Sequence, residues 1–159
     1  MRTLSKKTQY ALRALYVLAG NYGQGPTLIA KMAAQESIPQ DFLEAILLGM
    51  KRQGLVESKK GKGGGYSLSL PPDKITMGSV IRLLEGPLAP LPCASETAYR
   101  KCDECVDDRI CGTRMVMRQV RDAMAEILDG TTLAQVCERM EEAKARVAKD
   151  ADEALMYYI

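Results

Sequence analysis

The stretch that decides the fold is IPQDFLEAILLGMKRQGLVESKKGKGGGYSL, residues 38–68. In its first half, apolar residues recur every three or four positions, which predicts a helix that begins near Pro39 and ends before Gly54. Two strand-like runs follow at residues 55–57 and 66–70, and a segment rich in lysine and glycine joins them. The stretch therefore predicts a helix followed directly by a β-hairpin.

Upstream of this stretch the sequence predicts two more helices. Residues 4–19 have a broad apolar face, and glycines and a proline at residues 20–26 end that helix. A shorter helix is expected at residues 27–35. Three helices followed by a hairpin is the order of a winged helix-turn-helix, so the predicted fold is mainly α with a small β-hairpin wing. The expected inward stripe of the third helix is Phe42, Leu43, Ile46, Leu47 and Met50.

The second half of the chain predicts a different arrangement. Thr76 is expected to cap a helix that ends at Glu85, and a loop rich in proline and cysteine follows at residues 86–111. A long helix is expected at residues 113–129, followed by a further helix and a heavily charged helical tail. We accordingly predict three parts: a DNA-binding lobe at residues 1–72, a linker helix and cysteine-rich loop at 73–112, and a dimerisation helix with a helical tail at 113–159.

Charge is spread unevenly along the chain. Residues 1–74 contain eleven Lys and Arg against five Asp and Glu, whereas the remainder contains eleven against fifteen. A basic N-terminal lobe favours a polyanionic partner, although ordinary solvated charge would give the same count.

The chain has no histidine and no tryptophan. Without histidine it lacks the usual general base and the common partner of a catalytic serine or cysteine, so hydrolytic enzymes are disfavoured. The longest apolar run is far too short to span a bilayer, and no signal-type stretch follows the basic start. We expect a cytoplasmic protein with no membrane partner.

The lysine and glycine segment does not match a nucleotide-binding loop. Gly61-Lys62-Gly63 lacks the Ser or Thr of a P-loop, and a strand rather than a helix follows. A wing fits better, because Lys59, Lys60 and Lys62 would place ammonium groups at a hairpin tip next to glycines that permit close approach of the backbone. The expected ligand is the phosphate backbone of double-stranded DNA, and the alternative is a solvated hairpin with no ligand.

Four of the five cysteines fall in one segment of nineteen residues with the spacing C-x8-C-x2-C-x5-C. They are Cys93, Cys102, Cys105 and Cys111, whereas Cys137 lies on an apolar helical face and is expected in the core. Clustered thiols without a secretion signal indicate metal or redox chemistry rather than a disulfide scaffold. The spacing matches neither a zinc ribbon nor a ferredoxin, so a bound iron–sulfur cluster, thiol oxidation and a structural zinc all stay open.

Assembled in order, these segments resemble the bacterial Rrf-two regulators. The likeness covers roughly residues 1–140 and is carried by MRTLSKKTQYALRALYVLA, by the stretch quoted first, by VIRLLEGPLAPLPC and by the cysteine loop that runs into a long helix. The resemblance implies a dimeric winged-helix transcription factor with the helix at residues 113–129 as its interface. It also implies an iron–sulfur cluster, [2Fe–2S] or [4Fe–4S], held by three loop cysteines.

Carried over residue by residue, the resemblance implies where DNA is contacted. Gln40, Asp41, Phe42 and Glu44 occupy the start of the recognition helix, and Lys60 falls where several members have a wing arginine. Lysine lacks the bidentate fork of arginine, so Lys60 is expected to touch phosphate rather than read a base. The full set of expected DNA-binding residues is Gln40, Asp41, Phe42, Glu44, Lys51, Lys59, Lys60, Lys62, Gly63, Gly64 and Tyr66.

The resemblance also implies the ligands of the cluster. Cys93, Cys105 and Cys111 match the three family ligands, and Cys102 is the natural fourth, which would give an all-thiolate site. The first gap is longer than in the best-known members, and the aspartate that one nitric-oxide-sensing member uses corresponds to about Gln9. The expected function is a repressor that senses redox state, nitric oxide or iron status. The alternatives are a cluster-free regulator that uses thiol oxidation, for example a Cys102–Cys105 disulfide, or partner binding, and a zinc-stabilised interaction module.

Overall fold

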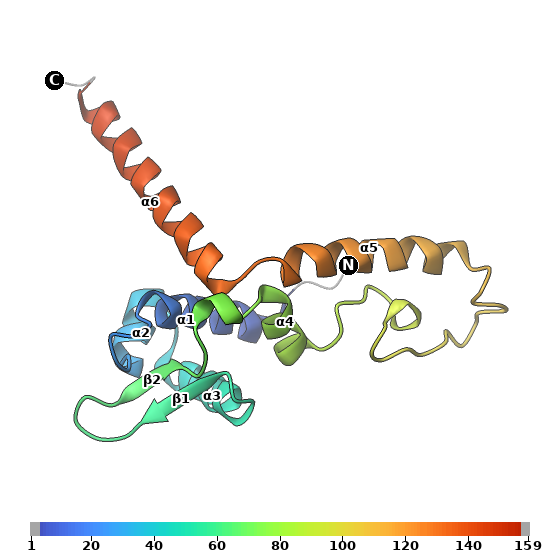
Figure 1. Cartoon of the computed structure of the whole chain (residues 1–159), viewed down its shortest axis with the longest axis horizontal. Helices are drawn as coiled ribbons and strands as arrows, with labels where there is room; N and C mark the ends of the chain where they lie inside the picture. The colour runs from blue at the N-terminus through green and yellow to red at the C-terminus, as the bar shows by residue number, and fades with distance from the viewer. Residues whose placement is uncertain (1–3, 157–159) are drawn as a thin grey trace.

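The computed structural model describes residues 4–156, and it describes side chains as far as Ala151. Figure 1 shows a helical lobe with a β-hairpin at one side, a helix that leaves the lobe above an irregular loop, and a last helix that projects away from it. The elements in chain order are α1 Lys6–Gly20, α2 Ile29–Glu36, α3 Gln40–Arg52, β1 Val56–Lys59, β2 Gly65–Leu68, η1 Pro72–Lys74, α4 Met77–Glu85, η2 Pro92–Ala94, α5 Gly112–Asp129 and α6 Leu133–Met156.

The first three helices are bounded by local signals. The Ser5 side chain accepts a hydrogen bond from the Thr8 amide and caps α1. Helix α2 ends at Ser37, whose backbone is left-handed with φ 50°. Helix α3 follows Pro39, and Gly54, with φ 74°, turns the chain out of it. The three predicted helices are therefore confirmed, with ends that differ by one or two residues.

The hairpin is displaced slightly from its predicted place. Strands β1 and β2 pair antiparallel from Val56↔Leu68 to Lys59↔Gly65. Gly65, predicted to lie in the loop, is thus the first residue of β2. The backbone of Thr27 exchanges two hydrogen bonds with Tyr66, at 2.8 and 2.9 Å, and comes so close to Gly65 that any Cβ there would collide with the Thr27 carbonyl. This third backbone segment holds the wing on the helical lobe.

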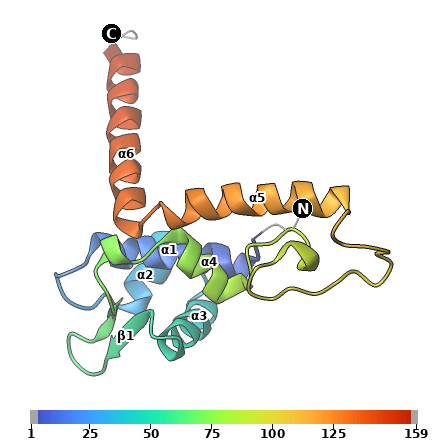
Figure 2. The same ribbon diagram turned by 45° about the vertical axis from the view of Figure 1, so that its right-hand side comes forward.

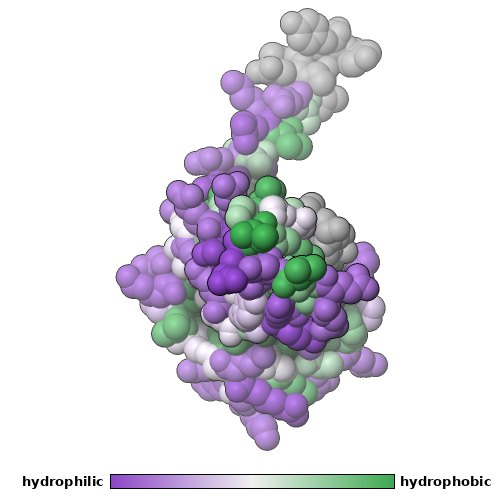
Figure 3. All heavy atoms as spheres, turned by 90° about the vertical axis from the view of Figure 1, so that its right-hand side faces the viewer, coloured by the Kyte–Doolittle hydropathy of each residue, from purple (hydrophilic) through white to green (hydrophobic). Residues whose placement is uncertain are grey.

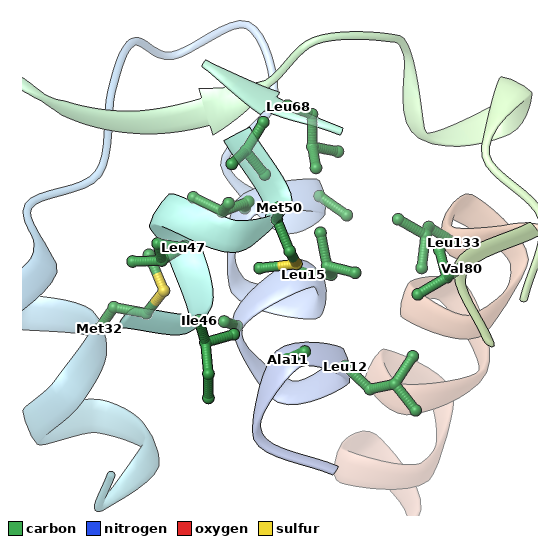
Figure 4. Close-up of a cluster of buried hydrophobic side chains, with 14 of the residues drawn as sticks. Ala11, Leu12, Leu15, Met32, Ile46, Leu47, Met50, Leu68, Val80 and Leu133 are labelled. Atoms are coloured by element: carbon green, nitrogen blue, oxygen red, sulfur yellow. The ribbon is translucent and has the colours of Figure 1, made fainter. Parts of the chain in front are cut away.

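The hydrophobic core joins residues that lie far apart in the sequence. Leu15 of α1, Met32 of α2 and Leu47 of α3 are fully buried together, and Leu133 at the start of α6 completes the same cluster (Figure 4). The expected inward stripe of α3 is confirmed except for Phe42. That side chain is 42% exposed, because its ring packs edge-on against Tyr10 at 5.7 Å instead of entering the core.

A short backbone ladder attaches the second half of the chain to the lobe. The Met77 amide donates to the Thr131 carbonyl at 2.8 Å, and the Leu133 amide donates to the Ile75 carbonyl at 2.9 Å. The turn between α5 and α6 is thereby fixed on the residues that precede α4. Thr76 caps α4 as predicted, since its hydroxyl accepts from the Ser79 amide.

Helices α5 and α6 leave this junction in different directions. In Figure 2, α5 runs across α4 to the cysteine loop, and α6 rises away from the lobe. The predicted charged tail is helical as far as Met156, and residues 157–159 of that prediction lie outside the described residues. Cys137 lies in the first turns of α6, half-buried against the core as expected, and its thiol donates to the Tyr16 carbonyl at 3.7 Å.

Helix α5 is also fixed by an ion pair at its C-terminal end. Arg82 of α4 donates to both carboxylate oxygens of Asp129, at 2.5 and 2.9 Å. A Cβ on Gly78 would collide with the Asp129 carboxylate, so glycine is needed for this close approach. Hydrogen bonding by Arg82 lowers the pKa of Asp129 below its usual value, and the charge of Arg82 adds to the effect.

Two neighbouring leucines of α3 test the assignment of the core. Leu47→Ala should lower the free energy of unfolding by about 2–5 kcal/mol, because Leu47 is fully buried and its removal leaves a cavity. Leu48→Ala is the matched control: Leu48 is 41% exposed, and its removal should cost less than about 1 kcal/mol. Urea denaturation at one protein concentration measures both. Equal losses would contradict the assigned helix face.

The Arg82–Asp129 pair predicts a dependence of stability on pH. Because the pKa of Asp129 is lowered on folding, the pair stabilises the fold above the unfolded pKa of about 3.9, and this stabilisation is lost as the pH falls through the folded value. The pair is exposed, so we expect no more than about 1 kcal/mol. The stability difference between wild type and Asp129→Asn should narrow from pH 7 to pH 3. Asp150→Asn, on the exposed part of α6, should show no such narrowing.

Candidate functional site

The first turns of α3 present a polar surface to solvent. Leu43 and Ile46 are buried in the lobe, and this orientation leaves Gln40, Asp41 and Glu44 exposed on the opposite side. Phe42 lies beside them and is partly exposed, because Tyr10 covers only one edge of its ring. The residues expected at the start of a recognition helix therefore share one accessible surface.

The tip of the hairpin carries three exposed lysines. Lys59, Lys60 and Lys62 form no ion pair with any residue that the structure describes. Gly61 and Gly63 turn the chain between them with φ 89° and 73°, a conformation that favours glycine. The ammonium groups are thus held on a short turn and are available to an external anion.

Gly64 has a role inside the turn. It is buried, its amide donates to the Gly61 carbonyl at 2.9 Å, and a Cβ there would collide with the backbone of Lys59. The sequence predicted that the backbone of Gly64 contacts DNA. The structure instead explains this glycine by the tightness of the turn, whereas Gly63 is exposed.

Two further residues expected to contact DNA connect the wing to α3. Lys51, at the end of α3, donates to the Ser58 hydroxyl of β1 at 2.5 Å. The Tyr66 hydroxyl belongs to a half-buried side chain, and burial, followed by the negative charge of Glu44, raises the pKa of Tyr66. Helix α3 and the hairpin therefore form a single surface, which Figure 1 shows on the side of the lobe away from α6.

Two of the four loop cysteines, Cys93 and Cys102, are in contact through their sulfur atoms. The Cys102 thiol donates to the Cys93 sulfur at a distance of 3.6 Å, and hydrogen bonding to Cys93 is the main reason that the pKa of Cys102 is raised. The pKa of Cys105 is also raised, by burial first and then by interaction with Cys111. Over residues 4–156, no three acidic or thiol side chains converge to hold a metal ion in this arrangement. The pairing places Cys102 against Cys93 rather than against Cys105.

The chemistry of this donor set fits an iron–sulfur cluster. Four thiols lie on one loop, and thiolates are the usual ligands of such clusters. Cys111 is the residue that immediately precedes α5. The four cysteines that the sequence singled out all lie on this loop, whereas Cys137 lies in the lobe.

Two arginines of α5 hold the loop, and the sequence pattern did not predict these contacts. Neither Arg114 nor Arg121 is among the site residues predicted from the sequence. Both donate to backbone carbonyls of the loop, Arg114 to Cys93 and Arg121 to Ala94. Their seven-residue spacing, which puts them on one side of a helix, is a signal in the sequence that could have identified them.

Helix α5 carries an uncovered apolar surface. Met115, Val116, Met124 and Ile127 are exposed, Ile127 to 68%. Figure 3 views the end of the molecule with the cysteine loop and shows apolar residues, in green, among polar ones. Apolar side chains that recur along one helix without a partner in the same chain are typical of a protein–protein interface.

This lobe, with its exposed helix and basic hairpin, defines the class of winged helix-turn-helix transcriptional regulators rather than an enzyme. Residues 4–139 match the Rrf2 family, described as an iron-dependent transcriptional regulator, and the chain belongs to that family. An rrf2-like HTH-type transcriptional regulator of Rhodobacter capsulatus is 37% identical over 82% of this chain and 89% of its own length.

Relatives with known names agree with this class. The HTH-type transcriptional regulator CymR of Bacillus subtilis is 34% identical over 98% of this chain and 99% of its own length. A solved structure of CymR, the global cysteine regulator of B. subtilis, is similar with a TM-score of 0.73, covering 87% of this chain and 98% of the other. IscR of T. potens is similar with a TM-score of 0.69 and 31% identity, covering 89% and 90%.

Within residues 4–156, no helix combines the length and the apolar character that crossing a membrane requires.

Proposed function

We propose that this chain is a homodimeric transcriptional repressor that senses redox state, nitric oxide or iron status through an iron–sulfur cluster. The observation that carries the proposal is the position of four cysteines on one loop at the start of α5, the helix with the exposed apolar surface. The description of the family as iron-dependent supports an iron centre. The cytoplasm is the proposed compartment, because its reducing conditions keep thiols available as ligands.

The DNA contacts divide into two kinds. Gln40, Asp41 and Glu44 would enter a groove, where polar side chains meet base edges. The wing lysines and the Gly63 backbone would meet phosphates, which supply affinity without sequence information. Lys51 would keep the two contact regions in register, because its ammonium group joins the end of α3 to Ser58 of β1, and Tyr66 would add a contact from β2.

A second copy of the chain would cover the apolar side of α5. Pairing along this helix would remove Val116, Met124 and Ile127 from water and would place two winged lobes on one DNA site. Because a symmetric dimer binds two DNA half-sites, we predict an operator with approximate two-fold symmetry.

Cys93, Cys102, Cys105 and Cys111 would hold the cluster, either [2Fe–2S] or [4Fe–4S]. Such a centre would supply one-electron redox chemistry and iron that reacts with nitric oxide. The residues of this chain would supply four thiolate ligands, one of them from Cys111 immediately before α5. A structural zinc is less favoured, because the spacing differs from that of known zinc modules.

Thiol oxidation is the second candidate function, and the Cys93–Cys102 contact favours it. The two sulfur atoms are 3.6 Å apart, so only a small movement is needed to reach the disulfide length of about 2.0 Å. A hydroperoxide would accept two electrons from the thiol pair and leave as water and an alcohol, with water alone from hydrogen peroxide. This pair replaces the Cys102–Cys105 disulfide that the sequence suggested.

An anaerobic preparation tests the leading proposal. The purified protein should be coloured and contain about two or four iron atoms per chain with matching sulfide. Cys105→Ser should lose the iron and colour while the dimer stays folded, since Cys105 lies outside the core. Cys137→Ser is the matched control and should retain both. Iron and sulfide assays with electron paramagnetic resonance measure the outcome.

A colourless, metal-free protein that still protects its promoter normally would contradict the cluster. Non-reducing peptide mass spectrometry after peroxide treatment then tests the second candidate. A Cys93–Cys102 cross-link accompanied by altered DNA binding would support it, and free thiols throughout would exclude it.

Salt dependence tests the wing. Lys60→Ala should weaken operator binding and reduce the slope of log affinity against log salt by about one unit, because one phosphate contact is lost. Lys144→Ala removes the same charge from α6, which projects on the other side of the lobe, and should leave the slope unchanged (Figure 1). Fluorescence anisotropy at several salt concentrations gives both slopes. Equal slopes for wild type and Lys60→Ala would remove Lys60 from the interface.

A further inference from the structure

Arg114 bridges the two arms of the cysteine loop. Its Nε donates to the Cys93 carbonyl at 2.8 Å, and its Nη1 donates to the Asp108 carbonyl at 3.1 Å. Cys102 and Cys105 lie between these two attachment points in the sequence. One guanidinium on the first turn of α5 therefore closes the loop that contains the inner cysteines.

Other contacts fix the orientation of Arg114. Its carboxylate partner is Asp108, with 3.4 Å between Nη1 and the carboxylate, and its guanidinium lies 5.4 Å from the centre of the Tyr99 ring. The Tyr99 hydroxyl donates to the same carboxylate at 2.5 Å. Hydrogen bonding by Tyr99, followed by the charge of Arg114, lowers the pKa of Asp108, so this carboxylate is ionised near neutral pH.

Arg121 makes a second attachment two turns further along α5. It is only 7% exposed, and its Nη1 donates to the Ala94 carbonyl at 2.7 Å. Glu96 lies 3.4 Å away, and Asp122 also accepts from the same guanidinium. Removing a charged side chain from water is costly unless its donors are used, and here a backbone carbonyl and two carboxylates use them.

Both arginines act on the segment that carries Cys93, which is itself 4% exposed. At its other end α5 is fixed to the lobe by Arg82 and by the turn before α6. Movement of the loop would therefore have to break contacts with a helix that is rigidly attached to the DNA-binding lobe.

We propose that Arg114 and Arg121 are positioning residues that clamp the cysteine loop onto α5 and transmit the state of its thiols to that helix. The identity of the group that the thiols bind rests on the proposed function, whereas the arginine contacts of the clamp are present in the chain without a metal. It keeps Cys93 shielded and holds both arms of the loop against the helix with the exposed apolar surface. In a dimer, a change at the thiols then alters the position of α5 and, through it, the spacing of the two lobes.

The test measures thiol accessibility in the reduced, metal-free full chain. Arg114→Gln removes the bridge, so Cys93 should react with iodoacetamide about ten-fold faster or more, because local opening no longer breaks two charge-assisted hydrogen bonds. Cys137 is the internal control, since it lies in the lobe and should keep its wild-type rate. Peptide mass spectrometry after timed alkylation follows each cysteine separately.

Two further variants separate the clamp from its alternatives. Arg118→Gln is the matched control: Arg118 lies one turn from Arg114 and is exposed, and its replacement should leave the Cys93 rate unchanged. Arg114→Lys keeps the charge but loses the fork, so Cys93 should react as in Arg114→Gln. If Cys93 reacts as slowly in Arg114→Lys as in the wild type, the bridging role of Arg114 is refuted.

Arg121→Lys extends the test to the second attachment, and it should speed alkylation of Cys93 in the same direction. An unchanged Cys93 rate in the Arg114 variants would overturn the clamp, and a parallel rise at Cys137 would show general unfolding and overturn it as well. These outcomes are independent of iron. If the wild-type chain binds no metal but Cys93 alone is alkylated faster in the Arg114 variants, the cluster is refuted and the clamp is supported. If the wild-type chain binds iron but the Cys93 rate is unchanged in those variants, only the clamp is refuted.

Discussion

The backbone ladder between residues 75–77 and 131–133 is the constraint on which the rest of the structure depends. Two hydrogen bonds, from Met77 to Thr131 and from Leu133 to Ile75, fix the turn between α5 and α6 on the winged lobe. They also place Leu133 in the core beside residues from α1 and α4. Helix α5 begins at the cysteine loop and ends at this ladder. Because the ladder fixes the C-terminal end of α5 on the lobe, a displacement of the loop that moves α5 also acts on the lobe.

The same arrangement separates three kinds of chemistry along the molecule. The lobe offers exposed lysines and polar side chains at the wing and α3, α5 offers apolar side chains without a partner in the same chain, and the loop offers thiols. The proposed function requires these regions to be distinct but mechanically connected. The ion pair of Arg82 with Asp129 and the carbonyl contacts of Arg114 connect the two ends of α5 to its neighbours.

Much of the fold could be predicted because it follows from local pattern. The helical spacing of apolar residues, the turn at Gly54 and the cap at Thr76 identify their elements without reference to distant contacts. Phe42 departed from its pattern, since Tyr10 provides a better partner for its ring than the core does. Gly65 joined a strand because it pairs with Lys59 of β1, and the close approach of Thr27, distant in the sequence, requires a glycine there.

By itself, the sequence determined a winged lobe, a basic hairpin and four cysteines ahead of a long amphipathic helix, because periodicity, glycine placement and residue type are local properties. Only the tertiary structure decided that Cys102 meets Cys93, that Gly64 is confined within its turn and that Arg114 and Arg121 hold the loop. The cysteine and arginine contacts depend on groups that folding brings together, and Gly64 is confined by the backbone conformation of its own turn. The amino-acid pattern does not show which carbonyl accepts from which arginine.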